Sequence, residues 1–98
     1  MKAGKYIRDL RETNGLLLRE LASGLSIDQA ILSKIERGER IPTKAQILAI
    51  SNYFEIKNEE LKILWLSDKV ICELKDEERL AKKVFKISEV RINTITNE

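Results

Sequence analysis

Residues 29–44 hold most of the side chains in this sequence that could do chemistry through hydrogen bonds and charge. The Gln29 amide carries a donor beside an acceptor, which complements the N6 and N7 atoms of adenine. Lys34 can donate to guanine or to a phosphate, and Ala30 and Ile31 can touch the methyl group of thymine. The candidates for binding phosphate oxygens are Arg19, Ser33, Arg37, Arg40, Thr43 and Lys44. Two alternatives stay open, because Ile31 could belong to a core and Arg37 could pair with a nearby glutamate.

Other kinds of chemistry are excluded by composition. The 98 residues include no histidine and a single cysteine, Cys72, which excludes His-based catalysis, His-containing metal sites and an intrachain disulfide. The sequence also lacks a glycine-rich phosphate loop, a nucleophile elbow and a cysteine cluster. We therefore expect no enzymatic activity, no metal and no cofactor. Cys72 is expected to act as a small buried hydrophobic residue within a helix.

The composition, 43% apolar and 35% charged, is typical of one small folded domain. No apolar run approaches the roughly 20 residues that cross a bilayer, and residues 1–5 do not resemble a secretory signal, so a cytoplasmic location is expected. The net charge of +2 divides unevenly. Residues 1–57 carry ten Lys and Arg against seven Asp and Glu, whereas residues 58–98 carry eight against nine. The positive excess in the first part permits nucleic-acid binding.

Apolar periodicity predicts an all-α chain. Helices are expected from about residue 3 to 13, 18 to 25, 29 to 38, 44 to 54, 58 to 74 and 76 to 95. Asp28 is placed to cap the third helix, and Thr43 with Gln46 has the form of a capping box before the fourth. The second and third helices are separated only by residues 26–28. Two short helices joined by so tight a turn have helix-turn-helix geometry, in which the second helix enters the major groove of DNA.

Several short motifs strengthen this interpretation. They are Ile7–Arg11 in the first helix, Leu21-Ala22 in the second, Leu32–Gly38 in the third and Pro42-Thr43 after it. With these motifs, residues 4 to about 56 resemble the Xre/Cro-type, lambda-repressor-like helix-turn-helix family. The resemblance implies a five-helix DNA-binding domain, here with an additional C-terminal helix. It also implies that Glu36 bonds within the domain.

The sequence departs from the family pattern at four positions. Leu17 and Leu18 replace the usual Thr-Gln, whose glutamine typically bonds a DNA phosphate, so that contact is in doubt. Ser26 and Glu55 stand where glycines are usual. A serine can adopt the left-handed conformation at modest cost, so we expect the fold to persist.

Residues 58–95 are expected to complete the core and to form a dimer interface, while residues 1–57 form the DNA-binding part. The last helix has apolar residues at helical spacing and must pack on its own domain or on another chain. We predict a homodimer anchored by Trp65, Ile71, Leu80, Val84 and Ile87. The alternative is that this helix only completes the monomer core.

Two classes of function follow from these expectations. The first is a regulator of transcription that binds double-stranded DNA at a two-fold operator and controls its own gene, as a repressor or as a controller of a restriction–modification system. The second is a protein-interaction module or antitoxin with weak DNA reading, for which a toxin would be a partner and either the last helix or the Leu17-Leu18 pair the contact.

Overall fold

The computed structural model describes residues 1–57 and 59–97, and all the regular structure in these ranges is helical. The elements are α1 (Lys2–Thr13), α2 (Leu18–Leu25), α3 (Gln29–Glu36), α4 (Lys44–Tyr53), α5 (Glu59–Glu73), the 3-10 turn η1 (Glu78–Leu80) and α6 (Ala81–Thr96). The predicted all-α fold with an additional C-terminal helix is confirmed, and α2 begins and ends at the predicted residues. Asn58, the predicted start of the fifth helix, lies outside the described residues.

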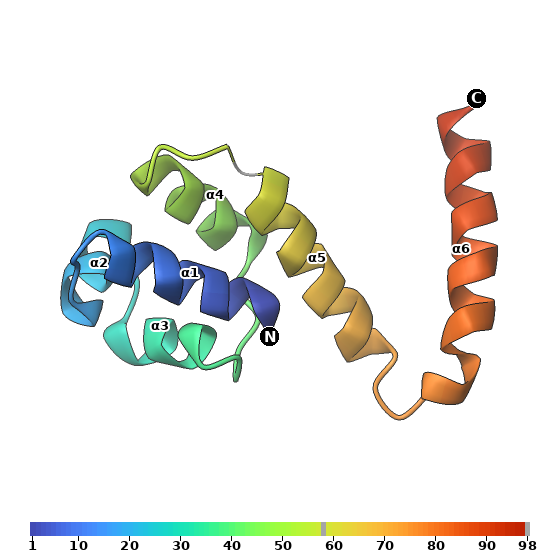
Figure 1. Cartoon of the computed structure of the whole chain (residues 1–98), viewed down its shortest axis with the longest axis horizontal. Coiled ribbons are helices and arrows are strands. Elements are labelled where there is room, and N and C mark those ends of the chain that lie inside the picture. Colours follow the sequence, from blue (N-terminus) through green and yellow to red (C-terminus); the bar gives the residue numbers. More distant parts are fainter. Residues whose placement is uncertain (58, 98) are drawn as a thin grey trace.

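Helices α1 to α4 and the inner face of α5 form one body, and the end of α5 runs outward from it (Figure 1). Each of α1 to α4 is followed by a residue in the left-handed conformation: Gly15 (φ 68°), Ser26 (φ 55°), Gly38 (φ 76°) and Glu55 (φ 53°). The N–H of the next residue then donates to a carbonyl five residues back, over 2.9–3.0 Å in all four cases. This is the hydrogen bond of a Schellman motif, which turns the chain sharply after each helix. Ser26 and Glu55 therefore keep a geometry that glycine usually supplies.

The core lies between α1, α2, α3, α4 and the inner face of α5. Its buried apolar side chains are Ala3, Ile7, Leu21, Ala22, Leu32, Ile35, Ile47, Ile50, Leu61 and Trp65. The helices α1 and α3 cross so closely that a Cβ atom on Gly4 would collide with the backbone carbonyl of Ile35. Glycine at this position is what allows the crossing.

Hydrogen bonds between distant residues tie the body together. The guanidinium of Arg11 donates from Nε and Nη2 to the two carboxylate oxygens of Glu36, at 2.8 and 3.0 Å, and from Nη1 to the carbonyl of Leu16 at 2.9 Å. The hydrogen bond to Glu36 raises the pKa of Arg11. This bond joins α1 to α3 and confirms that Glu36 bonds within the domain. The indole of Trp65 donates to the Pro42 carbonyl at 2.7 Å and so joins α5 to the loop before α4.

Asp68 on α5 caps the N-terminus of α1. Its two carboxylate oxygens accept from the backbone N–H groups of Lys2 and Ala3, at 3.0 and 2.9 Å. The side chain is buried, and its charge faces the positive end of the α1 dipole. A helix whose own first residues offer no side-chain cap is thus completed by a residue far along the chain.

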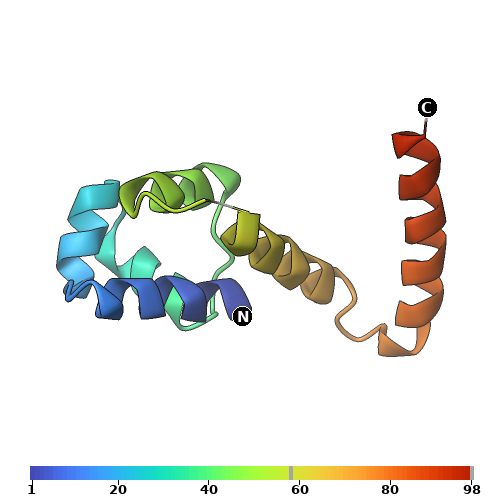
Figure 2. The ribbon, with the colours of Figure 1, turned by 45° about the horizontal axis from the view of Figure 1, so that its top comes forward.

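Helix α6 stands apart from this body in both views of the ribbon (Figures 1 and 2). None of its residues is buried. The radius of gyration is 15.7 Å, whereas a compact chain of this length would have about 13 Å. The prediction that Cys72 is buried is wrong: its side chain is exposed, because the end of α5 projects beyond the body. No helix in the described part of the chain is both long enough and apolar enough to cross a membrane.

Candidate nucleic-acid interface

Helix α3 is held by its inner face and its N-cap. Leu32, Ile35 and Glu36 are buried against the body, whereas Gln29, Ala30 and Lys34 are exposed and Ile31 and Ser33 are half-buried. The Asp28 carboxylate accepts from the N–H groups of Ala30 and Ile31, at 2.9 and 3.2 Å. The predicted role of Asp28 as an N-cap is confirmed. This cap and the left-handed Ser26 together set the angle between α2 and α3.

The structure places three of the four predicted base-reading residues on the outer face of α3. Gln29, Ala30 and Lys34 are exposed, and they occupy the first two positions of the helix and a position one turn later. Ile31 is half-buried and packs against the core. Ile31 thus has a structural role and still presents part of its side chain beside Gln29 and Ala30.

The predicted phosphate-binding cations lie before and after α3 in the sequence. Arg19 is exposed on α2, Arg40 on the loop before α4 and Lys44 at the first position of α4. None of these three takes part in an ion pair with another described residue. Ser33 is half-buried. The exposed side chains of Arg19, Arg40 and Lys44 are therefore available to bind an external anion.

Arg37 forms an ion pair with Glu39, in which Nε lies 2.7 Å from a carboxylate oxygen. This is the alternative that the sequence left open for Arg37. Both side chains remain more than half exposed, at 55% and 57%, and a pair so open to solvent is weak. Arg37 could exchange this partner for a phosphate at little cost.

The N-terminus of α4 is the second element that the sequence predicts to bind an anion. Thr43 Oγ1 accepts from the N–H of Gln46 at 3.1 Å, and Gln46 Oε1 accepts from the N–H of Thr43 at 2.9 Å, which confirms the predicted capping box. The amides of Lys44 and Ala45 have no hydrogen-bond partner among the described residues. They point along the axis toward the positive end of the helix dipole, where an anion is favoured.

The N-terminus of α2 is built differently. Leu17 is 49% exposed and precedes the helix, and its N–H donates to the Glu20 carboxylate at 2.8 Å. A carboxylate therefore lies at the start of α2, two positions after Leu18, which replaces the family's glutamine. Sequence reasoning did not single out Glu20, although an acid at the third position of a helix signals this kind of cap.

The predicted dimer anchors fall into two groups. Trp65 is buried in the core of its own chain, at 5% exposure. The exposed members are Ile71, Leu80, Val84 and Ile87. All four lie on α5, η1 and α6, away from the exposed face of α3 along the chain.

Comparison with known proteins identifies the segment that contains these elements. A model of a helix-turn-helix family matches residues 7–61, which include α2, α3 and α4 entirely. The chain is also similar to the uncharacterized HTH-type transcriptional regulator YazB of Bacillus subtilis (strain 168). The two are 36% identical over 58 residues, or 59% of this chain and 84% of that protein. No solved structure matches the chain.

Proposed function

The chain belongs to the helix-turn-helix family, and we propose that it is a sequence-specific DNA-binding regulator of transcription, acting as a homodimer on a two-fold operator in front of its own gene. The observation that carries the proposal is the exposed start of α3. There the amide of Gln29 and the ammonium of Lys34 project from a helix whose other face is fixed in the core. A rigid helix that presents a few polar side chains is what reading of the major groove requires.

Affinity and specificity come from different groups in this proposal. A bidentate contact between an amide and adenine discriminates by about 1–3 kcal/mol, so Gln29 and Lys34 can supply sequence preference. Arg19, Arg40, Lys44 and the free amides at the start of α4 supply phosphate contacts. These contacts provide most of the affinity and make it fall steeply with salt, because counterions are released from the DNA.

The small size of the reading surface supports the proposed dimer. The described part of the chain contains one helix-turn-helix, and a single α3 reads only a few base pairs. Two-fold dimers of such domains place their recognition helices in successive major grooves, about 34 Å apart, and so double the contacts. The exposed apolar residues of α5 and α6 lie outside the DNA-reading part and are available for this pairing.

A salt titration of DNA binding by fluorescence anisotropy tests the proposal. The duplex from upstream of the protein's own gene is compared with a scrambled duplex of equal length. We expect tight binding to the native duplex alone, with a steep loss of affinity as salt increases. Equal weak binding to both duplexes, or none to either, would contradict an autoregulatory role.

Substitutions separate the two kinds of contact. Gln29→Ala is expected to reduce binding to the native duplex about tenfold or more while leaving the scrambled duplex unchanged. Lys44→Ala is expected to weaken both and to lower the salt slope by about 1. Lys57→Ala is a matched control, since Lys57 is also exposed but follows the opposite end of α4. An effect of Lys57→Ala as large as that of Lys44→Ala would argue against the assignment of this surface.

The cap of α2 favours a second candidate, a protein-interaction module. The Glu20 carboxylate at this helix start repels phosphate, and Leu17 offers an exposed apolar contact beside it. Under this alternative the protein binds no duplex even at low salt. Glu20→Gln distinguishes the two, because removing the charge should strengthen DNA binding by a regulator and leave a non-binding module unchanged.

A further inference from the structure

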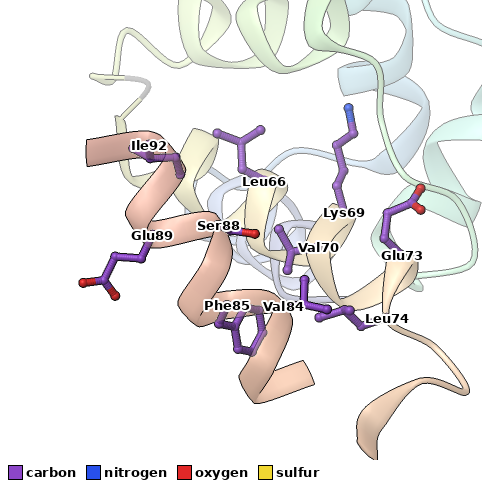
Figure 3. Close-up of a pocket in the computed structure, with 10 residues that line it drawn as sticks. All are labelled: Leu66, Lys69, Val70, Glu73, Leu74, Val84, Phe85, Ser88, Glu89 and Ile92. Atoms are coloured by element: carbon purple, nitrogen blue, oxygen red, sulfur yellow. The ribbon is translucent and has the colours of Figure 1, made fainter. Parts of the chain in front are cut away.

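An apolar groove separates α5 from α6. Its volume is about 590 Å³, and its walls include Leu66 and Val70 on α5 and Val84, Phe85 and Ile92 on α6. Figure 3 shows Val70 and Val84 pointing toward each other, whereas the charged ends of Lys69 and Glu89 point away. The groove therefore has two facing apolar walls and no charged group at its centre.

Helix α6 is apolar on two opposite sides. At 100° per residue, Phe85, Ser88 and Ile92 fall on the side that lines the groove. Ile87 and Val90 fall on the other side, do not line the groove, and are 61% and 60% exposed. A helix with two apolar sides needs a neighbour on each of them.

The charges of the two helices are opposite. Helix α5 exposes the carboxylates Glu59, Glu60 and Glu73, since Asp68 is buried against α1, and it carries two lysines. Helix α6 carries the cations Lys82, Lys83, Lys86 and Arg91 against one glutamate. Two copies of α6 repel each other along their polar sides, but each copy of α6 is attracted to a copy of α5.

The exposed surface is too large for a monomer of this mass. The chain exposes 7328 Å², whereas a folded monomer of 11.3 kDa is expected to expose about 5,700 Å². The excess of about 1,600 Å² exceeds the roughly 800 Å² that each partner buries in a standard interface. Most of the exposed large apolar side chains in the described ranges lie on α5, η1 and α6.

We propose that the occupant of the groove is α6 of a second copy of this chain, inserted reciprocally, so that each α6 lies between α5 and α6 of its partner. The inserted helix presents its Phe85–Ile92 side to the other α6 and its Ile87–Val90 side to the acidic α5. This exchange rests on the homodimer of the proposed function and gives it a specific interface. It covers both apolar sides of α6 and places each basic helix against an acidic one.

Closure of α6 onto its own α5 would not cover both apolar sides of α6. A hairpin of the two helices buries the groove-lining side of α6 and leaves Ile87 and Val90 in water. The Ile87–Val90 side therefore distinguishes exchange from closure. A substitution there leaves a closed hairpin intact and disrupts an exchanged dimer.

The first test measures the mass of the full chain by light scattering over a range of concentrations. We expect twice the 11.3 kDa chain mass. Val90→Glu and Ile92→Glu should each raise the dimer dissociation constant roughly a hundredfold, because each buries a carboxylate in an apolar contact. Asn93→Glu is the matched control on the polar side and should leave the dimer unchanged. Fluorescence of Trp65, which is buried in the body, checks that each variant stays folded.

The second test locates the partner by disulfide formation in a Cys72→Ser background. One preparation carries Val70→Cys on α5 and the other carries Val90→Cys on α6. Exchange predicts a mixed disulfide between the two preparations, and none when Lys82→Cys replaces Val90→Cys. The proposal is overturned if the chain is a monomer at all concentrations. It is also overturned if the chain dimerises, Val90→Glu leaves the dimer dissociation constant unchanged, and no mixed disulfide forms. These readouts contain no DNA, so their failure is distinct from a failure of DNA reading in the anisotropy titration.

Discussion

Side-chain hydrogen bonds in the body join residues as far apart as Lys2 and Asp68, whereas those of α6 reach only three or four residues within the helix. The body also contains every buried apolar side chain of the described ranges, and α6 contains none. The two regions are similar in apolar character but differ in what covers them. The body is stabilised by its own chain, whereas in the proposed dimer α6 is covered by a second copy.

The buried body and the exposed α6 have different tasks in the proposed function. The body must hold α3 at a fixed angle, and the bonds from Arg11 to Glu36 and from Trp65 to Pro42 serve that rigidity. In the proposed dimer, the projecting α6 stays accessible to a second copy. Substitutions that affect one region and spare the other are therefore the most informative.

The largest expected effect is that of Glu36→Ala. It leaves the Arg11 guanidinium nearly buried without its hydrogen-bonded carboxylate partner, which we expect to lower the free energy of unfolding by about 3–5 kcal/mol. The side chains of the pair are only 13% and 5% exposed. Urea unfolding followed by Trp65 fluorescence measures the loss. Joint replacement by Arg11→Met and Glu36→Leu should recover part of it, and a loss of under 1 kcal/mol for Glu36→Ala would contradict the role of this pair.

The same chemical change in each region tests the comparison directly. Ile50→Ala removes a fully buried side chain and should cost about 3 kcal/mol. Ile87→Ala, at a position 61% exposed, should cost less than about 0.5 kcal/mol when the chain is dilute enough to be monomeric. Urea unfolding measures both. Equal losses would show that α6 packs on its own body.

The two faces of α5 provide a smaller contrast. Asp68→Ala removes the acceptor of two backbone N–H groups of α1 and should lower the free energy of unfolding by about 1–2 kcal/mol. Ser67→Ala, at the neighbouring exposed position, is the control and should not lower it. The interpretation fails if hydrogen exchange at the start of α1 is the same in Asp68→Ala as in the parent protein.

The smallest expected effect is a gain. The Ser51 hydroxyl is buried in α4 and has no hydrogen-bond partner among the described residues. Ser51→Ala should raise the free energy of unfolding by about 1 kcal/mol, through desolvation and helix propensity. Ser23→Ala, on the exposed side of α2, measures the propensity contribution alone. A loss of stability in Ser51→Ala would indicate that the hydroxyl does have a partner.

Much of the body could be predicted from local signals. The leucine spacing and the Asp28 cap located α2 and α3, and Thr43 with Gln46 located the start of α4, because these signals act within one turn of the chain. The bond from Asp68 to α1 could not be predicted in this way. Its only signal is an acid that shares a helical face with Leu61 and Trp65, and its partner lies 65 residues away.

The candidate site was predictable to a similar degree. The helical spacing of the apolar residues indicated which side chains of α3 face outward. Gln29, Ala30 and Lys34 are exposed, as this spacing predicted. The pairing of Arg37 with Glu39 depends on rotamers, which the sequence does not determine. The Glu20 cap did have a local signal, an acid at the third position of α2, which sequence reasoning missed. The burial of Cys72 was predicted wrongly. Apolar residues at helical spacing indicate that one face of a helix packs against something, but not that the same chain supplies the contact.

Hydrogen exchange of the full chain at two concentrations tests most directly whether the body and α6 are stabilised from different sources. We predict that protection of α1–α4 and of the inner face of α5 is the same at both concentrations, and that protection of α6 increases with concentration. Strong protection of α6 that does not change when the chain is diluted to a monomer would contradict the dependence of α6 on a second copy.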